Sequence, residues 1–110
     1  MNKKKSYRSL GQIILERRKA IPLTQRQAAA LIRKSNGKPI SAVYLNDIEH
    51  DRRSPSSDHL IEQFAKVLDI PMEVLYLVTR RIPPTYFSIR SSDDEKKVIQ
   101  AFEAFQAALR

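Results

Sequence analysis

The sequence ISAVYLNDIEHDRR, at residues 40–53, has the pattern of a short helix with one buried face. Ser41 belongs to the residue types favoured at helix N-caps, so the helix is predicted to begin there and to end near His50. Because successive helical residues turn by about 100°, the predicted inward face holds Leu45, Ile48 and Glu49. The predicted outward face holds Val43, Asn46, Asp47 and His50.

This stretch also places Asp47, Glu49 and Asp51 in the basic half of a chain whose net charge is +8. Residues 1–53 contain 13 Lys and Arg against 4 Asp and Glu, whereas residues 54–110 contain 7 against 8. A carboxylate that faces the core, as Glu49 is predicted to do, is strongly destabilising unless it is paired. We therefore expect a cationic side chain to meet Glu49.

Length and composition indicate one soluble, helical domain with a short appendage in this chain of 110 residues. Gly occurs only 2 times, aromatic residues make up 7%, and no segment alternates as a β-strand does. The lack of Cys excludes disulfides and thiolate metal sites and suits a reducing compartment. No apolar run approaches the roughly 18 residues of a membrane span, and the basic N-terminal stretch lacks the apolar core of a signal peptide. We expect a cytoplasmic protein.

The concentration of Lys and Arg in residues 1–53 favours a polyanionic partner, either nucleic acid or an anionic membrane surface. A charged surface that serves solubility alone is the other interpretation. The membrane surface is the weaker of the two partner classes, because no predicted helix combines a basic face with a broad exposed apolar face.

Four more helices are predicted around residues 41–50. The first runs from about Ser9 to Ala20, and the second follows the N-cap Thr24 and ends near Lys34. The buried stripe of the second is predicted to hold Ala28, Leu31 and Ile32. A further helix follows Ser56 or Ser57, and another opens at Pro71. Their predicted inward residues are Leu60, Ile61, Phe64, Ala65 and Leu68 in the former, and Val74, Leu75 and Val78 in the latter.

The predicted organisation has four parts: a basic arm at 1–8, a helical domain at 9–80, a linker at 81–91 and a C-terminal helix at 92–110. Ser92 has capping-box spacing to Glu95 at the start of that helix. A heptad seam runs along it through Val98, Phe102, Phe105 and Leu109. The seam is expected to pair with a second copy of the chain; packing on its own domain and docking to another protein are the alternatives.

Three segments together resemble a known family: LGQIILERRKAIPLTQRQAAALI, SAVYLNDIEHDRRSPS and LIEQFAKVLDIPMEVLYL. In this order they are similar to the helices of the Cro/repressor type of helix-turn-helix domain, the lambda-repressor-like family. The resemblance covers residues 10–78, and the ordered combination is far more specific than any one segment. It implies an all-α, five-helix domain whose third helix is the recognition helix that enters the major groove of DNA.

The resemblance assigns structural roles to two of the acids. In this family an Arg of the first helix pairs with a Glu near the end of the recognition helix, which implies a salt bridge between Arg18 and Glu49. Glu49 is then structural and does not approach DNA. Asp51 stands where the family usually has Gly, so we expect it to stop the helix in a left-handed conformation.

The resemblance also implies DNA contacts. The second helix lies with its first residues against a phosphate, and the third turns its N-terminal part to the base edges. Ala42 and Val43 suit a thymine methyl, and Asn46 suits an adenine. Asp47 either accepts from a cytosine amine or is merely solvated. The expected DNA-contacting residues are Thr24, Gln25, Arg26, Lys34, Lys38, Ser41, Ala42, Val43, Tyr44, Asn46, Asp47, Arg52 and Arg53.

Two features depart from the family. Residues 33–39, RKSNGKP, lengthen the turn before the recognition helix. They are expected to extend the second helix, widen the turn, and bring Arg33, Lys34 and Lys38 within reach of the DNA backbone. The helix at 92–110 lies outside the family domain altogether.

Catalytic and metal chemistry finds little support in the sequence. His50 and His59 have no second pair of metal ligands nearby, and the serines of SPSSDH are better explained as helix caps than as nucleophiles. There is no glycine-rich phosphate loop. We expect no enzyme activity, no metal and no cofactor.

These observations predict a sequence-specific regulator of transcription that binds double-stranded DNA, as a repressor-like homodimer on a palindromic operator. The alternative is a protein-interaction module, such as an antitoxin or an adaptor, whose C-terminal helix docks to a partner protein.

Overall fold

The computed structural model describes residues 8–81 and 92–109, and all named elements within them are helices. They are α1 (Leu10–Ala20), α2 (Gln25–Leu31), α3 (Ala42–Glu49), α4 (Asp58–Leu68), α5 (Met72–Val78) and α6 (Ser92–Ala108). The all-α class is therefore confirmed for these residues. Of the expected basic arm and linker, only Arg8 and Arg81 fall within the described residues.

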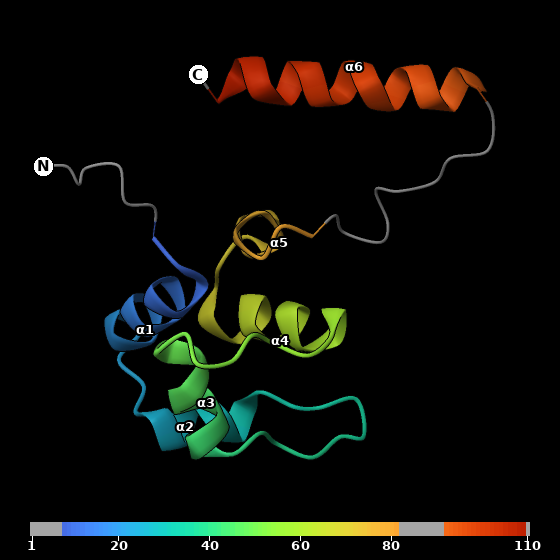
Figure 1. Ribbon diagram of the computed structural model, residues 1–110. Helices are drawn as coiled ribbons and strands as arrows, with labels where there is room; N and C mark the ends of the chain where they lie inside the picture. Colours follow the sequence, from blue (N-terminus) through green and yellow to red (C-terminus); the bar gives the residue numbers. More distant parts are fainter. Residues whose placement is uncertain (1–7, 82–91, 110) are drawn as a thin grey trace, which may run out of the picture.

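Helices α1 to α5 form one body, with α2 and α3 at one end and α5 at the other (Figure 1). The segment that joins α2 to α3 projects sideways from the α2–α3 end (Figure 1). Helix α3 packs against both α1 and α2, and α4 packs against α1 and α5. The recognition-helix candidate is thus supported from two sides and presents its remaining surface to solvent.

Serine and threonine caps begin the first four helices, as the sequence pattern predicts. Ser9 and Thr24 each accept a hydrogen bond from the backbone N–H three residues on, and a Gln side chain at that position closes a capping box. Ser41 and Ser57 accept in the same way at the start of α3 and α4. Each such cap is worth about 1 kcal/mol, so these helix starts are set locally.

The core is a single cluster formed by the inward faces of α1 to α5. Every residue predicted inward on α3 is buried, including Glu49 at 3% exposure. The α4 stripe is buried as predicted, with Ile61, Phe64 and Leu68 fully enclosed. Burial of one large apolar side chain contributes roughly 1.5–3 kcal/mol, so the packing of α3 on this cluster holds the recognition-helix candidate in place.

Helices α1 and α3 approach each other most closely at Gly11. A Cβ on Gly11 would lie 2.5 Å from the carbonyl oxygen of Ile48 and 2.7 Å from that of Glu49. Asp51 joins the two helices at this point. It has φ 59°, the expected left-handed stop, and its carboxylate accepts hydrogen bonds from the Gly11 N–H at 3.0 Å and the Ser9 hydroxyl at 2.7 Å. Asp51 therefore also serves the N-terminus of α1, where an anion is favourable.

Helix α2 differs from the prediction, because it ends at Leu31 and does not continue to Lys34. Ile32 adopts an extended conformation, with φ −94° and ψ 117°, which turns its side chain into the core. Leu31 is consequently 53% exposed, and Ala29 is buried in its place. The expected extension of α2 by residues 33–39 is wrong: Arg33 and Pro39 instead form an isolated antiparallel bridge.

Helix α5 is turned slightly from the predicted orientation. Leu75 is buried as predicted, but Val74 is 38% exposed and Tyr76 is buried at 1%. Burial raises the pKa of the Tyr76 hydroxyl, and the nearby carboxylates of Asp58 and Glu62 raise it further. Arg80, just after the C-cap of α5, has φ 60°.

Helix α6 lies apart from α1 to α5, beyond the α5 end (Figure 1). Of its predicted seam, Val98 is partly exposed and the other three residues are exposed: Phe102 at 51%, Phe105 at 46% and Leu109 at 62%. The alternative in which the seam packs on its own domain is therefore not what the described residues adopt. No helix in residues 8–81 or 92–109 combines the length and apolar character needed to cross a bilayer.

Candidate nucleic-acid interface

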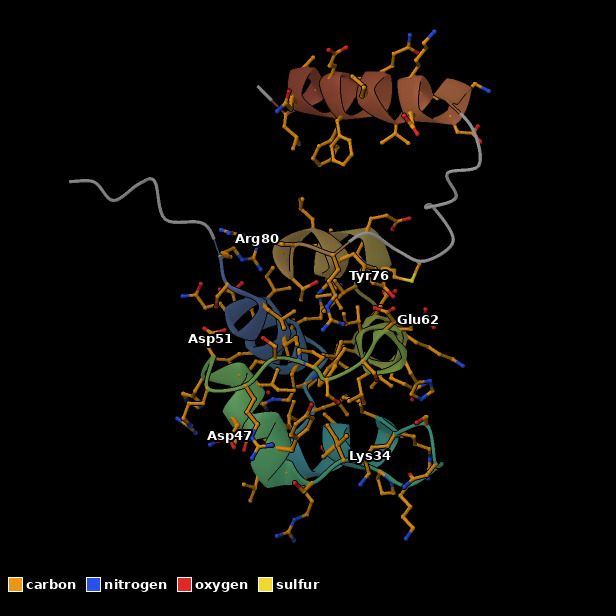
Figure 2. The ribbon with its side chains drawn as sticks, turned by 45° about the vertical axis from the view of Figure 1, so that its right-hand side comes forward. Lys34, Asp47, Asp51, Glu62, Tyr76 and Arg80 are labelled. Carbon is orange, nitrogen blue, oxygen red and sulfur yellow. The ribbon has the colours of Figure 1, made fainter. Side chains whose placement is uncertain are left out.

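The predicted DNA-contacting residues gather at the α2–α3 end of the body. Figure 2 shows Lys34 and Asp47 at this end, away from Tyr76 and Arg80 at the α5 end. Both helices and the loop between them contribute to this surface. The ion pairs and hydrogen bonds that its acidic side chains make within the protein determine which charges this surface presents to solvent.

Glu49 pairs with Arg18 inside the body, as the family resemblance implied. Arg18 Nε lies 2.5 Å from Glu49 Oε2, and Arg18 Nη2 lies 3.0 Å from Oε1. The side chains are 10% and 0% exposed, and Arg18 Nη1 also donates to the Leu23 carbonyl at 2.8 Å. This two-point pairing removes Glu49 from the surface and joins α3 to the C-terminal half of α1.

Gln25 extends this network to the surface, a role that the sequence did not reveal. Its Nε2 donates to Glu49 Oε1 at 2.8 Å and to Asn46 Oδ1 at 2.9 Å. An ionised carboxylate only accepts hydrogen bonds, so the Gln25 amide must turn its NH₂ group to Glu49 and Asn46 must turn its oxygen to Gln25. This link leaves the Asn46 NH₂ group without a hydrogen-bond acceptor among the described residues, while the expected position of Gln25 against a phosphate stays a prediction.

Asp47 is neutralised by the two arginines that follow α3. Arg52 Nε lies 2.9 Å from Asp47 Oδ1, and Arg53 Nε lies 3.5 Å from Oδ2. The Asp47 side chain is 23% exposed. The carboxylate is therefore already paired, which makes the expected contact with a cytosine amine the weaker interpretation.

Tyr44 is half-buried, and its ring supports Arg53, whose guanidinium carbon lies 5.7 Å from the ring centroid. The Tyr44 hydroxyl is buried and finds no hydrogen-bond partner in residues 8–81 or 92–109. This differs from the expected phosphate contact, because the hydroxyl is turned away from the surface. The residue acts on the surface through Arg53.

The outer face of α3 remains open. Val43 is 72% exposed, and Ala42 and Asn46 are partly exposed. Three exposed cations are also present: Arg26 on α2, and Lys34 and Lys38 on the loop that follows it. No carboxylate of the described residues pairs with them. The surface therefore combines an apolar methyl-bearing group, an amide donor and unpaired cations.

All three acids of residues 40–53 thus have partners within the protein. Glu49 is paired with Arg18, Asp47 with Arg52 and Arg53, and Asp51 with the start of α1. None of the three presents a free carboxylate to a ligand. These three acids therefore bind groups within the fold and do not pair with Arg26, Lys34 or Lys38.

Within the described residues no group of three or more His, Cys, Asp or Glu is arranged to hold a metal ion. The two histidines bond to backbone carbonyls: His50 Nδ1 lies 2.8 Å from the oxygen of Asn46, and His59 Nε2 lies 3.0 Å from that of Arg33. Comparison of the chain with models of protein families, with curated proteins and with solved structures gave no match.

Proposed function

We propose that the chain is a sequence-specific regulator of transcription that binds double-stranded DNA through a lambda-repressor-like helix-turn-helix formed by α2 and α3. Helix α3 enters the major groove, Val43 and Asn46 meet base edges, and the flanking cations meet phosphates. The protein acts as a homodimer on a palindromic operator, in the cytoplasm.

One observation carries this proposal. Every acid in and directly after α3 is paired internally, whereas Arg26, Lys34 and Lys38 have no carboxylate partner in residues 8–81 or 92–109. A surface that serves only solubility does not require every one of its carboxylates to be paired within the protein. Phosphates at about 1.7 Å intervals along the duplex axis are the polyanion that such a surface fits.

A membrane surface is less well matched to this interface. The exposed apolar residue of α3, Val43, is a single side chain, and the unpaired basic residues lie on α2 and the loop that follows it. Interfacial membrane helices need a continuous apolar face beside the basic one. The shape and chemistry of α3 favour a groove lined with bases.

The direct test is selection of bound fragments from a pool of random duplexes with the full chain. The expected result is enrichment of one motif with two inverted half-sites, bound with an affinity that falls steeply as salt rises. A pool that shows no enrichment at moderate ionic strength contradicts the proposal.

Val43→Ala and Asn46→Ala are each expected to change the preferred base at one position of the selected motif. The loss of one good base contact corresponds to about 1–3 kcal/mol of discrimination. Gln25→Ala is expected to relax the preference at the same position as Asn46→Ala, because Gln25 donates a hydrogen bond to the Asn46 oxygen and so orients that amide.

Arg26→Ala is the matched control for these variants, since Arg26 is exposed and its loss leaves no described carboxylate unpaired. It is expected to weaken binding to all sequences by a similar factor. Competition assays with single-base variants of the motif measure both effects. If all four variants weakened every sequence alike, the assignment of α3 to the bases would be wrong.

The exposed seam of α6 supports the dimer. Phe102, Phe105 and Leu109 form a narrow apolar stripe at heptad spacing, the geometry by which two helices pair. Two copies double the number of base pairs contacted, which a short recognition helix needs in order to be specific.

The double substitution Phe102→Glu/Phe105→Glu is expected to convert the full chain from dimer to monomer, because like charges would meet in the seam. Sedimentation equilibrium measures the change, and Gln100→Glu/Gln106→Glu on the same helix is the control that adds equal charge outside the seam. A wild-type chain that is monomeric throughout favours the second candidate function instead, an adaptor or antitoxin whose α6 docks to another protein.

A further inference from the structure

The loop between α2 and α3 is an ordered hairpin. Its two ends are anchored in the core by Ile32 and Ile40, which are 0% and 5% exposed. The Ile40 N–H donates to the Ile32 carbonyl at 2.9 Å, and the Lys34 N–H donates to the Lys38 carbonyl at 2.8 Å. Gly37 closes the turn with φ 87°, a conformation that Gly adopts at little cost. We call residues 32–40 the α2–α3 hairpin.

Helix α4 braces the hairpin at its base. The Arg33 N–H donates to Gln63 Oε1 at 3.0 Å, and the Arg33 carbonyl accepts from His59 Nε2 at 3.0 Å. A lone two-stranded hairpin is marginally stable in water, so these two contacts to α4 add to the Ile32 and Ile40 anchors in holding it in place. A braced element loses little conformational freedom when it binds a ligand.

The hairpin carries positive charge alone. Its residues Arg33, Lys34 and Lys38 are exposed, and residues 32–40 contain no Asp or Glu. Arg33 donates to the Gly37 carbonyl at 2.9 Å, which stiffens the turn. Lys34 and Lys38 are in no ion pair with the described residues and do not contribute to the core.

An open groove of about 1010 Å³ separates the hairpin from the segment that follows α3. Lys34 and Asn36 line its hairpin side, and Arg53, Ser54 and Ser56 line the opposite side. Val43 and Tyr44 of α3 also line the groove. The one carboxylate that borders the groove, Asp47, is paired with Arg52 and Arg53. Cations and hydroxyls on both sides of an open channel suit an extended chain of phosphates.

We propose that the α2–α3 hairpin is a second DNA-contacting element, which holds the backbone of one strand in the groove beside α3. Lys34 and Lys38 meet phosphates on the outer side of that strand while Arg53 meets it from the other side. The inference rests on the proposed function and adds to it a wider footprint, in which each protomer grips the backbone beyond the bases that α3 contacts.

The test compares two double variants of the full chain on the duplex motif selected by the wild type. Lys34→Gln/Lys38→Gln is expected to reduce the slope of log affinity against log salt by about 1.8, since each phosphate that is no longer neutralised lowers it by about 0.9. Hydroxyl-radical footprinting is expected to lose protection of the backbone at the outer edge of each half-site, while the preferred bases stay the same. Lys66→Gln/Lys96→Gln removes the same charge from exposed positions on α4 and α6 and is expected to leave slope and footprint unchanged.

Gln63→Ala is a further variant that keeps every charge but removes one hydrogen bond at the base of the hairpin. It is expected to weaken DNA binding about threefold and to reduce the hydroxyl-radical protection of the backbone at the outer edge of each half-site. If the wild type binds no duplex, the proposed function itself fails. If the wild type binds its motif but the two lysine variants give equal slopes and equal footprints, the function stands and the role of the hairpin is refuted.

Discussion

Replacing Arg18 with Met is expected to remove about 3–5 kcal/mol from the free energy of unfolding. Met fills much of the space of the Arg side chain, so the main effect is electrostatic. The Glu49 carboxylate stays buried without its cationic partner, with Gln25 as its remaining hydrogen-bond donor. The whole free energy of unfolding of a small domain is roughly 5–15 kcal/mol. This variant is therefore expected to be close to unfolded at physiological temperature. Urea denaturation followed by circular dichroism measures the loss.

Two controls separate the ion pair from general damage. Glu16→Gln breaks the Arg8–Glu16 pair on the same helix, whose side chains are 60% and 59% exposed, and is expected to change stability by less than about 0.5 kcal/mol. The double variant Arg18→Met/Glu49→Leu removes both charges and is expected to recover most of the loss, since a buried pair replaced by apolar residues is often neutral. A double variant no more stable than Arg18→Met would show that packing, and not the unpaired charge, causes the effect.

Gly11→Ala is expected to destabilise the domain by about 3 kcal/mol, at the upper end of overpacking. The added Cβ would lie 2.5 Å from the Ile48 carbonyl oxygen and 2.7 Å from the Glu49 oxygen and from Asp51 Oδ1. Two of these three atoms belong to the backbone of α3, so the strain can be relieved only by moving the helices apart. An ordinary Gly→Ala change in a helix gains up to about 1 kcal/mol, so a net loss identifies the close contact of α1 and α3.

Gly37→Ala is the matched comparison, because Gly37 has φ 87° and nothing lies within 4 Å of an added Cβ. It is expected to cost about 1–2 kcal/mol from backbone conformation alone. Thermal denaturation measures both losses, which have different causes: a steric clash at Gly11, which lies in α1, and backbone strain at Gly37. A Gly11→Ala chain as stable as the wild type would mean that α1 and α3 are further apart than described.

The local features of this protein follow from its sequence. Side chains at helical spacing predict the buried faces of α3 and α4, and the caps Ser9, Thr24 and Ser41 predict where three helices begin, because caps and periodicity depend only on residues within one or two turns. The need of Glu49 for a cationic partner follows from the same periodicity. Family resemblance was required to name Arg18 as that partner.

Partners far apart in the chain were decided by the tertiary structure. Gln25 and Asn46 are 21 positions apart, Gly11 and Asp51 are 40 apart, and the hairpin brace joins Arg33 to Gln63 across 30. No short-range pattern encodes these contacts, since each exists only after the helices have packed. The same holds for the end of α2, where the burial of Ile32 in the core outweighs the helical preference of the residues that follow.

The sequence by itself therefore determined that this protein is helical, where most of its helices begin, and that Glu49 faces inward. Only the tertiary structure decided which cations pair with Asp47 and which groups donate hydrogen bonds to Asp51, and so which cations of the chain are left for a ligand. The physical reason is that charge pairing depends on distances in space, which helical periodicity does not contain.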